Sequence, residues 1–428
     1  MAAEIPGIAE RRILKLLYAL EQDEPVIALH GPRSVGKSTL LRSFADTRGV
    51  SVIDLDDPSV LDAVMANPSQ AVGGPRPVCL DEYQKAPDLL DALKARLNRE
   101  GSQAGTAVLT GSTRHDAIPL TAQALTGRLH ILTILPLSQG EIGGQRENLL
   151  DALMHDPSLA VAACPTSSTT RDDYVRRVCS GGFPLALRRT GSARARWFDD
   201  YVRLSIQRDA VELARIRQRQ TLGVLFEHLA GQTAQVFNAT SAFRGIEADR
   251  KTLDGYVRLL EDLFLVRLLP AWGKTLRAKS SKLPKLHVID SGLAARLLRS
   301  SEAKLATLDP TALTEFGNLL ETFVVGELCK QVSWLDEPVT VGHWRTTDNE
   351  HNEVDLVIEF NNGDVLAFEV KANQRVSGRD FQGLRKLRDA LGERFVAGIA
   401  FSTGQRSYTY EERLHVLPVD RLWRSINT

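Results

Sequence analysis

The stretch Gly31-Pro32-Arg33-Ser34-Val35-Gly36-Lys37-Ser38 decides the fold of the N-terminal part of this chain. It fits the phosphate-binding loop pattern Gly-x-x-x-x-Gly-Lys-Ser at every fixed position. The apolar run Val26 to His30 precedes it and predicts a strand, and the amphipathic stretch Thr39 to Ala45 follows it and predicts a helix. This order of strand, loop and helix predicts a nucleoside triphosphate site, whereas a glycine-rich turn alone would not.

Each residue type in the loop has a physical role in binding ATP with Mg²⁺. The glycines allow a tight turn that brings N–H groups to the β-phosphate, and the helix that starts near Gly36 directs its positive dipole end there. We expect Lys37 to reach the β- and γ-phosphates and the Ser38 hydroxyl to hold Mg²⁺. The predicted nucleotide-binding residues are Gly31, Pro32, Arg33, Ser34, Val35, Gly36, Lys37, Ser38 and Thr39, together with Asp81 and Ser112.

Composition is that of an ordinary globular protein. The 428 residues are 43% hydrophobic and 25% charged, and the formal net charge is zero, so any surface for nucleic acid must be local. None of the four cysteines forms a Cys-x-x-Cys pair, which argues against a zinc site or a disulfide framework. No signal peptide and no uncharged apolar run near the ~20 residues of a membrane helix is visible. We therefore expect a cytoplasmic protein with no membrane partner.

A second motif, which ends in two acidic residues, follows the loop. The run Val78-Cys79-Leu80-Asp81-Glu82 reads as a buried parallel strand that delivers two carboxylates to the carboxyl edge of a sheet. We expect Asp81 to bind Mg²⁺ through water and Glu82 to polarise the attacking water. In the next predicted strand, Ala107 to Thr110, either Thr110 or Ser112 could sense the γ-phosphate, or their hydroxyls could cap their own turn.

Two arginines are candidates for a finger that stabilises transition-state charge from a neighbouring subunit, Arg114 and Arg128. Arg128 is favoured because it directly precedes a fifth strand predicted over His130 to Leu135. Either side chain could equally be a solvated surface arginine. An active finger would make the protein a homo-oligomer whose subunits complete one another's sites.

Together these runs resemble a family of prokaryotic AAA+-type ATPases that carry a C-terminal domain of unknown function. The resemblance covers nearly the whole chain, and implies a five-stranded parallel ATPase sheet with a helical lid. The stretches that carry it are Gly31 to Ser38, Leu80 to Pro87, Leu109 to Ser112, Leu125 to Arg128, Gly181 to Pro184, Tyr201, and Arg208-Asp209.

The middle of the chain predicts a winged helix. Helical patterns over Leu222 to Gln232, Thr240 to Ile246 and Arg250 to Phe264 precede strand patterns at Leu265 to Leu269 and His287 to Ile289. A basic connecting segment would suit phosphate contacts on a duplex, although such a domain can also serve protein packing alone. The basic residues of that segment are Lys274, Arg277, Lys279, Lys282 and Lys285.

The C-terminal part predicts a helix over Leu313 to Val332, then three strands, a helix over Asp380 to Leu391 and a last strand over Phe395 to Phe401. The three strands are expected over Val339 to Arg345, Glu353 to Phe360 and Asp364 to Ala372. Because side chains in a strand repeat every two residues, Glu369 and Lys371 should face the same side.

This order of elements resembles the core of the PD-(D/E)xK nuclease superfamily. The resemblance implies that Asp355 is the first motif acid, that Glu369-Val370-Lys371 is the second motif and that Glu321 is the acid of the helix. Asp355, Glu369 and Glu321 would then hold Mg²⁺ with hard oxygen ligands, and Lys371 would position or activate water. The alternative is an inactive scaffold in which Glu369 and Lys371 form a simple ion pair.

We therefore predict an α/β protein with a P-loop ATPase core (1–140), a helical lid and linker (141–220), a winged helix (221–300) and a nuclease-like domain (301–428). The predicted catalytic residues are Lys37, Glu82, Arg128, Asp355, Glu369 and Lys371, and the predicted metal ligands are Ser38, Asp81, Glu321, Asp355 and Glu369. The predicted function is ATP hydrolysis that controls a DNA-binding, Mg²⁺-dependent nuclease, with DNA favoured over RNA. The alternatives are a regulatory switch that acts through protein contacts and a DNA-binding ATPase that cuts nothing.

Overall fold

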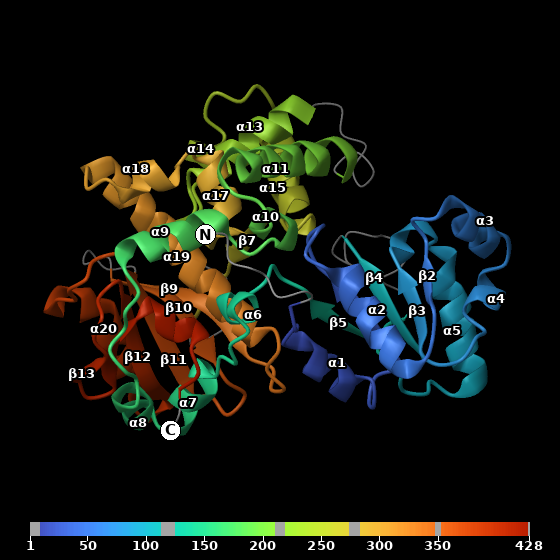
Figure 1. The fold of residues 1–428 in the computed structure, drawn as a ribbon, viewed down its shortest axis with the longest axis horizontal. Helices are drawn as coiled ribbons and strands as arrows, with labels where there is room; N and C mark the ends of the chain where they lie inside the picture. Colours follow the sequence, from blue (N-terminus) through green and yellow to red (C-terminus); the bar gives the residue numbers. More distant parts are fainter. Residues whose placement is uncertain (1–8, 113–124, 210–218, 274–282, 347–351, 427–428) are drawn as a thin grey trace.

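The computed structural model describes residues 9–112, 125–209, 219–273, 283–346 and 352–426. Figure 1 shows an N-terminal α/β domain on one side of the molecule and the rest of the chain together on the other. Within these ranges, no helix is long and apolar enough to cross a membrane.

The N-terminal domain is built on a five-stranded parallel sheet in the order β2-β3-β4-β1-β5. Its strands are β1 (Val26–His30), β2 (Val52–Asp54), β3 (Val78–Asp81), β4 (Ala107–Gly111) and β5 (Leu129–Thr133). Strands β1, β3 and β4 are buried along their whole length, which explains why they read as continuous apolar runs. Short β2 was not predicted individually from the sequence.

Helices cover both faces of this sheet. Alternate strand residues enter two separate cores: Ile27 and Leu29 pack with helices α1 and α2, whereas Val26 and Ala28 pack with α5. The helical segments of the domain are α1 (Ile13–Leu20), α2 (Lys37–Arg48), α3 (Pro58–Ala66), α4 (Pro68–Ala71), the 3₁₀ turn η1 (Tyr83–Lys85) and α5 (Asp88–Glu100). The three-layer architecture follows directly from the two-residue period of the strands.

The next helices pack away from the ATPase sheet. They are α6 (Gln139–Gly143), α7 (Leu149–His155), α8 (Pro157–Ala162), α9 (Arg171–Ser180), α10 (Pro184–Leu187) and α11 (Gly191–Leu204), followed by a π-helical turn over Ser205–Asp209. Helix α8 contacts the C-terminal strands and α9 contacts the helices that follow the middle domain (Figure 1). The described residues 141–209 thus contact the C-terminal half of the chain, and their assignment as a helical lid and linker of the ATPase stays a prediction.

The middle domain contains the three predicted helices and the predicted hairpin. Its elements are α13 (Arg219–Ala230), β6 (Gln235–Val236), α14 (Ala239–Ala242), α15 (Arg250–Asp262), β7 (Val266–Leu269) and β8 (Lys285–Val288). The strands form an antiparallel sheet in the order β6-β8-β7, so that β8 is central. Strand β8 begins at Lys285, two residues earlier than its apolar pattern predicts. Helices α17 (Ser291–Leu297) and α18 (Glu302–Ala306) lead to the C-terminal domain.

The C-terminal domain is a six-stranded mixed sheet in the order β13-β14-β12-β11-β10-β9. The predicted elements are α19 (Pro310–Val332), β9 (Thr340–Arg345), β10 (Glu353–Glu359), β11 (Val365–Lys371), α20 (Gln382–Leu391) and β12 (Phe395–Ser402). The sequence missed β13 (Tyr408–Glu411), β14 (Leu414–Pro418) and the 3₁₀ turns η4 (Gly378–Phe381), η5 (Gly392–Arg394) and η6 (Val419–Trp423). Helices α19 and α20 cover opposite faces, because successive residues of β10 alternate between two cores.

Candidate functional site

The P-loop joins the end of β1 to the first residue of α2, which is Lys37. Ser34 and Gly36 both have positive φ, at 62° and 93°, so the loop needs left-handed backbone at two points. A Cβ at Gly31 would lie 2.0 Å from the backbone oxygen of Ile134, which explains glycine there. The predicted residues Gly31 to Ser38 thus form one compact turn at the carboxyl end of the sheet, and Thr39 follows on the exposed side of α2.

The ammonium group of Lys37 lies inside this loop. Its Nζ donates to the backbone oxygens of Gly31 and Pro32, at 2.9 and 2.8 Å, and the side chain is buried. A lysine at the N-terminus of a helix can replace these hydrogen bonds to carbonyl oxygens by hydrogen bonds to phosphate oxygens.

Asp81 and Glu82 stand beside the loop at the carboxyl end of β3, and both are buried. Thr110 of the neighbouring strand β4 donates its hydroxyl to Asp81 and accepts the Glu82 N–H at 3.0 Å. The Ser112 hydroxyl donates to Glu82 Oε1 at 2.8 Å. The structure thus brings both candidate sensor hydroxyls onto the two acids.

Sequence reasoning missed a buried pair behind these acids. The Tyr83 hydroxyl lies 3.0 Å from His30 Nε2, and burial raises the pKa of this tyrosine above its usual value. His30 is the last residue of β1, directly before the P-loop, so the pair links the acid-bearing strand to the loop. Its signal in the sequence is a histidine at the end of an otherwise apolar strand.

Of the two candidates for an arginine finger, the structure describes one. Arg114 lies outside the described residues. Arg128 directly precedes β5, whose first residue pairs with the first residue of β1, and its guanidinium donates to Asn98 at 2.7 Å. Because the strands are parallel, Arg128 lies at the amino edge of the sheet and the P-loop at the carboxyl edge. Its own subunit's nucleotide is therefore out of its reach, and a role in a neighbouring subunit stays a prediction.

A second constellation lies between the middle and C-terminal domains. Glu321 of α19, Asp355 of β10, and Glu369 and Lys371 of β11 come together as the sequence predicted. Asp355 Oδ2 accepts the Val370 N–H at 2.8 Å, which ties β10 to β11 at this point. Lys371 Nζ lies 2.6 Å from Glu369 Oε1, as expected for side chains on the same face of a strand.

Lys285 occupies the centre of this acidic cluster, which consists of Glu321, Glu353, Asp355 and Glu369. Its Nζ lies 2.5 Å from Glu321 Oε1, 2.7 Å from Glu353 Oε1 and 2.8 Å from Asp355 Oδ1, and the side chain is 2% exposed. This corrects the prediction that Lys285 belongs to a basic surface for nucleic acid. The other basic residues of that segment, Lys274, Arg277, Lys279 and Lys282, lie outside the described residues.

Burial and neighbouring charges together raise the pKa values of both Glu369 and Lys285 in this cluster. Burial, aided by the charge of Asp355, raises the pKa of Glu369 to about 8. Burial alone would lower the pKa of Lys285, but the charges of Asp355, Glu321 and Glu353 outweigh it and raise this pKa well above its usual value. The ammonium therefore stays charged and holds the carboxylates together.

The donor set of this cluster fits a hard divalent cation. It consists of carboxylate oxygens, the ligands that Mg²⁺ prefers, and the buried Glu369 Oε2 has no hydrogen-bond partner. Among the side chains that the structure describes, however, no three histidines, cysteines or acids are arranged to hold a metal ion. The physical reason is the position of Lys285, around which the acids are gathered.

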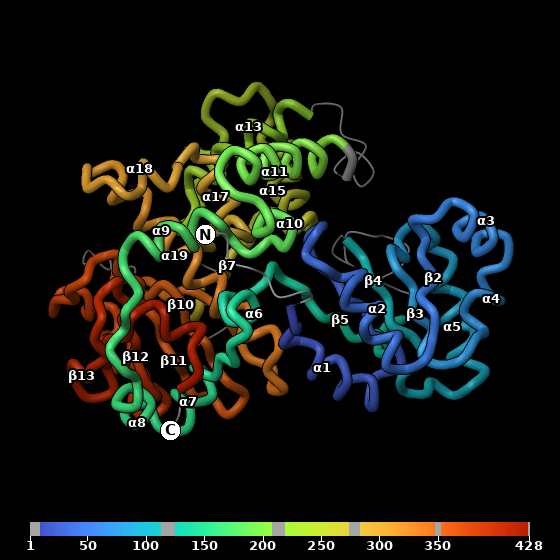
Figure 2. The backbone as a smooth tube through the Cα atoms, in the orientation of Figure 1, coloured from blue at the N-terminus to red at the C-terminus, as the bar shows by residue number. Residues whose placement is uncertain are grey.

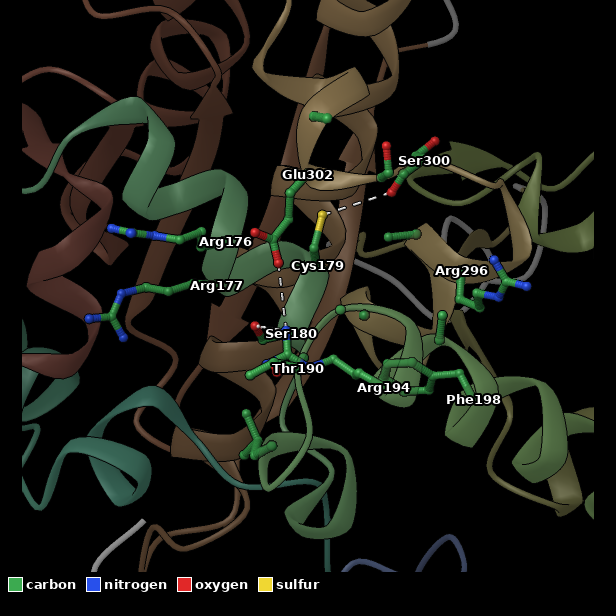
Figure 3. Close-up of a pocket in the computed structure, with 18 of the residues that line it drawn as sticks. Arg176, Arg177, Cys179, Ser180, Thr190, Arg194, Phe198, Arg296, Ser300 and Glu302 are labelled. Carbon is green, nitrogen blue, oxygen red and sulfur yellow. Dashed lines mark hydrogen bonds and ion pairs between the residues drawn. The ribbon is translucent and has the colours of Figure 1, made fainter. Parts of the chain in front are cut away.

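A third feature is a cavity of about 980 Å³ between α9, α11, α17 and α18 (Figure 3). Arginines line it, but protein acids already contact several of them. Arg194 lies 3.6 Å from Glu302, and Arg296 lies 2.7 Å from Asp199. These pairings offset the positive charge that an anionic ligand would need, so we assign the cavity no ligand.

The segment after β5 connects the ATPase domain to the C-terminal half of the chain. In Figure 2 the tube runs from β5 to α6. Arg11 contacts the first part of this segment. Its guanidinium donates to the Val35 oxygen of the P-loop at 2.9 Å, to the Leu135 oxygen at 2.7 Å and to Glu141 at 3.1 Å. The loop and the segment after β5 thus share one partly buried cation.

Helix α19 holds the same segment from the other side. Glu327 Oε2 accepts the Gln139 N–H at 2.7 Å, and Lys330 Nζ donates to the Leu137 oxygen at 3.0 Å. Lys330 and Glu327 also pair at 2.6 Å, and both are buried.

Three parts of the chain match models of known domain families. Residues 23–143 match an AAA domain, residues 171–304 match a domain of unknown function (DUF8612), and residues 316–422 match another domain of unknown function (DUF4143). The second match runs across residue 220, where the sequence predicted a domain boundary. This agrees with the packing of α9 to α11 on the middle and C-terminal domains.

Related proteins and solved structures resemble the chain over much of its length. The uncharacterized proteins Rv2008c of Mycobacterium tuberculosis and Mb2031c of Mycobacterium bovis are each 25% identical over 402 residues, which are 93% of this chain and 81% of theirs. The Walker-type ATPase PABY2304 of Pyrococcus abyssi aligns with a TM-score of 0.42 at 14% identity, over 70% of this chain and all of its own. AMPPCP-bound DnaA of Aquifex aeolicus aligns with a TM-score of 0.26 at 12% identity, over 58% of this chain and 85% of its own.

The AAA domain match covers the P-loop, the two strand acids and both candidate sensor hydroxyls. Residues 23–143 are therefore similar to AAA-type P-loop ATPase domains, and this similarity supports ATP binding by the N-terminal domain.

Proposed function

We propose that this protein binds ATP with Mg²⁺ at the P-loop and hydrolyses it. The observation that carries the proposal is the position of the P-loop beside Asp81 and Glu82 at one edge of the sheet. Lys37 and the N–H groups of the loop would hold the phosphates, while Ser38 and Asp81 would hold Mg²⁺. Bound Mg²⁺ supplies charge neutralisation at the phosphates. Glu82, oriented by Ser112, would accept a proton from the attacking water.

Nucleotide binding and turnover of purified protein test this proposal. Lys37→Ala should abolish ATP binding, whereas Glu82→Gln should keep ATP affinity within about threefold and lower kcat by about 100-fold or more. Lys94→Ala removes an exposed lysine from α5 of the same domain and serves as the matched control. Normal turnover in Glu82→Gln would refute the assigned general base, and ATP binding by Lys37→Ala would refute the assigned phosphate site.

We further propose that subunits complete one another's ATP sites, with Arg128 acting in a neighbouring subunit of a homo-oligomer. The support is its position at the edge of the sheet opposite the P-loop of its own subunit. Mixing Arg128→Ala with Lys37→Ala subunits should then restore part of the turnover that each lacks alone. A mixture that stays inactive although both variants assemble with wild type would overturn the assignment.

For the C-terminal half we propose Mg²⁺-dependent cleavage of nucleic acid, with DNA favoured over RNA, under control of the ATPase. The support is the grouping of Glu321, Asp355, Glu369 and Lys371 on a helix and two strands in the predicted order. The three acids would hold Mg²⁺, which supplies stabilisation of the developing phosphate charge. Lys371 would donate to the attacked phosphate, and Glu369 would fix Lys371 through their ion pair.

The proposed winged helix would bring the nucleic acid to this site. On α15, Arg250, Lys251 and Arg258 are exposed, as a helix that contacts duplex phosphates requires. In this proposal the middle domain positions the duplex and the C-terminal domain cuts it. The competing function is a DNA-binding or regulatory ATPase whose C-terminal domain is an inactive scaffold.

Cleavage assays separate these functions. Single- and double-stranded DNA and RNA are incubated with Mg²⁺ or Mn²⁺, with and without ATP, beside Lys371→Ala and Asp355→Asn. Glu393→Gln removes one exposed acid from the same domain and serves as the control. Cleavage lost in Lys371→Ala and in Lys37→Ala would support ATP control. No cleavage under any condition would favour the scaffold.

A further inference from the structure

We propose that Lys285 is a built-in cation that blocks the C-terminal acidic site, so that this site takes a divalent metal ion only when the lysine withdraws. The inference deepens the proposed nuclease function, because it names how the chain itself controls that site. It concerns the acidic cluster of Glu321, Glu353, Asp355 and Glu369 described above.

The positions of the oxygens carry the inference. Three carboxylate oxygens from α19 and β10 lie 2.5–2.8 Å from Lys285 Nζ. This Nζ donates a hydrogen bond to Asp355 and forms ion pairs with Glu321 and Glu353. A divalent ion binds such oxygens at about 2.0–2.6 Å, so the centre of the same three oxygens would coincide with the nitrogen. Lysine and metal ion cannot share this position.

Charge balance points to the same conclusion. Among the described residues, two ammonium groups pair with the four carboxylates of the cluster, those of Lys285 and Lys371. When all four carboxylates are ionised, which for Glu369 requires a pH above about 8, the group keeps two net negative charges. A divalent ion in place of Lys285 would leave less uncompensated negative charge, and the unpartnered Glu369 Oε2 could become its ligand.

The blocking residue and the acids belong to different parts of the fold. Lys285 is the first residue of β8 in the middle domain, whereas Glu321 and Asp355 belong to the C-terminal domain. A shift of the middle sheet against α19 would therefore withdraw the ammonium without unfolding the acidic site. In the present arrangement the Thr233 and Thr322 hydroxyls, 2.8 Å apart, join the two parts.

A purely structural ion pair between the domains would make a different prediction. Removing the lysine would then leave buried carboxylates that repel one another, with loss of stability and no affinity for metal. A blocked metal site instead gains affinity when the lysine is removed. Metal binding, measured apart from any cleavage, decides between the two.

The experiment is a calorimetric Mn²⁺ titration of full-length protein without nucleotide. Lys285→Ala should bind one Mn²⁺ at least tenfold more tightly than wild type, and adding Asp355→Asn to this variant should remove the gain. Lys330→Ala is the matched control, because Lys330 is also buried and ion-paired to a glutamate of α19 but lies outside the cluster. Its Mn²⁺ affinity should equal that of wild type.

A charge-balanced variant covers the case in which Lys285→Ala does not fold. Lys285→Ala with Glu353→Gln removes one cation and one anion together and leaves Glu321, Asp355 and Glu369 as ligands. This variant should also bind Mn²⁺ at least tenfold more tightly than wild type. Folded protein of either variant without a gain in affinity would overturn the proposal.

The same proteins separate this inference from the proposed nuclease. Tight Mn²⁺ binding in Lys285→Ala without cleavage of DNA or RNA would support the block and refute the nuclease. Tight Mn²⁺ binding and cleavage already in wild type would support the nuclease and refute the block.

Discussion

Replacing Thr110 by valine tests how the ATPase domain holds its acids. The Thr110 side chain is fully buried, donates its hydroxyl to Asp81 and accepts the Glu82 N–H. Valine keeps the shape but removes both hydrogen bonds. A hydrogen bond to a charged group contributes about 1.5–3 kcal/mol, and a buried N–H left without a partner costs about 1–3 kcal/mol. The two contributions together amount to about 2.5–6 kcal/mol, and we take the middle of this range, about 3–5 kcal/mol, as the expected loss in stability of this region.

Amide hydrogen exchange, read by mass spectrometry on peptides of β3 and β4, measures this loss directly. Intrinsic fluorescence cannot, because the first of the five tryptophans is Trp197, outside the ATPase domain. A loss of 3–5 kcal/mol corresponds to exchange about 100- to 4,000-fold faster. Thr110→Ser keeps the hydroxyl and should lose only about 1 kcal/mol. Equal effects of serine and valine, or less than tenfold faster exchange in Thr110→Val, would refute the assigned hydrogen bonds.

Three further predictions follow from burial and close contact. Burial, with the charge of Lys285, lowers the pKa of His287 well below its usual value, so below about pH 6.5 only the unfolded chain takes up its proton. As the pH is lowered from 7 to 5, the free energy of unfolding should therefore fall by up to about 1.4 kcal/mol per pH unit, and it should fall less steeply in His287→Leu. Urea unfolding followed by tryptophan fluorescence at pH 5–7 measures both slopes. Gly31→Ala, which places a Cβ on a backbone oxygen, should cost about 1–3 kcal/mol by calorimetry, whereas Gly74→Ala, with open space around it, should cost less than 1 kcal/mol. Burial raises the pKa of Cys79 to about 12, so iodoacetamide at pH 8 should leave this thiol unmodified in folded protein and alkylate it in urea, as peptide mass spectrometry would show.

The nucleotide site was predictable because its signals are local. Eight consecutive residues from Gly31 to Ser38 form the loop, and Asp81 and Glu82 end an apolar run. What local sequence does not contain is the order of strands in the sheet. Only because β4 lies between β1 and β3 do Thr110 and Ser112 reach the two acids. Their role as acid-holding hydroxyls therefore appears only in the folded domain.

Lys285 shows where local reading fails. It follows three other lysines in a basic stretch, which indicates a solvated surface. Its burial depends on Glu321, Glu353 and Asp355, which lie 36, 68 and 70 residues further along the chain. The sequence nevertheless contains a sign that Lys285 lies in a strand, since Lys285 and His287 alternate with Leu286 and Val288. Such alternation places the two polar side chains on one face of the strand.

The last strands were missed for a different reason. Strand β13 is short and mostly exposed, and its tyrosines Tyr408 and Tyr410 remain 39% and 38% exposed at the edge of the sheet. An edge strand of this kind has no continuous apolar run to mark it. Helices α7 and α8 were not predicted either, because each is too short, at seven and six residues, for a clear helical periodicity.

Helix α19 contacts both the acidic cluster and the segment after β5. Glu321, a partner of Lys285, and Glu327, which holds the segment after β5, are six residues apart on this helix. That segment in turn shares Arg11 with the P-loop. A change of loop shape on binding phosphate would act first on the Val35 oxygen and hence on Arg11, through direct hydrogen bonds that are partly buried. If α19 then moves against β8, the distance that changes is the one between Lys285 and its acids, so control by ATP and release of the lysine would be the same motion.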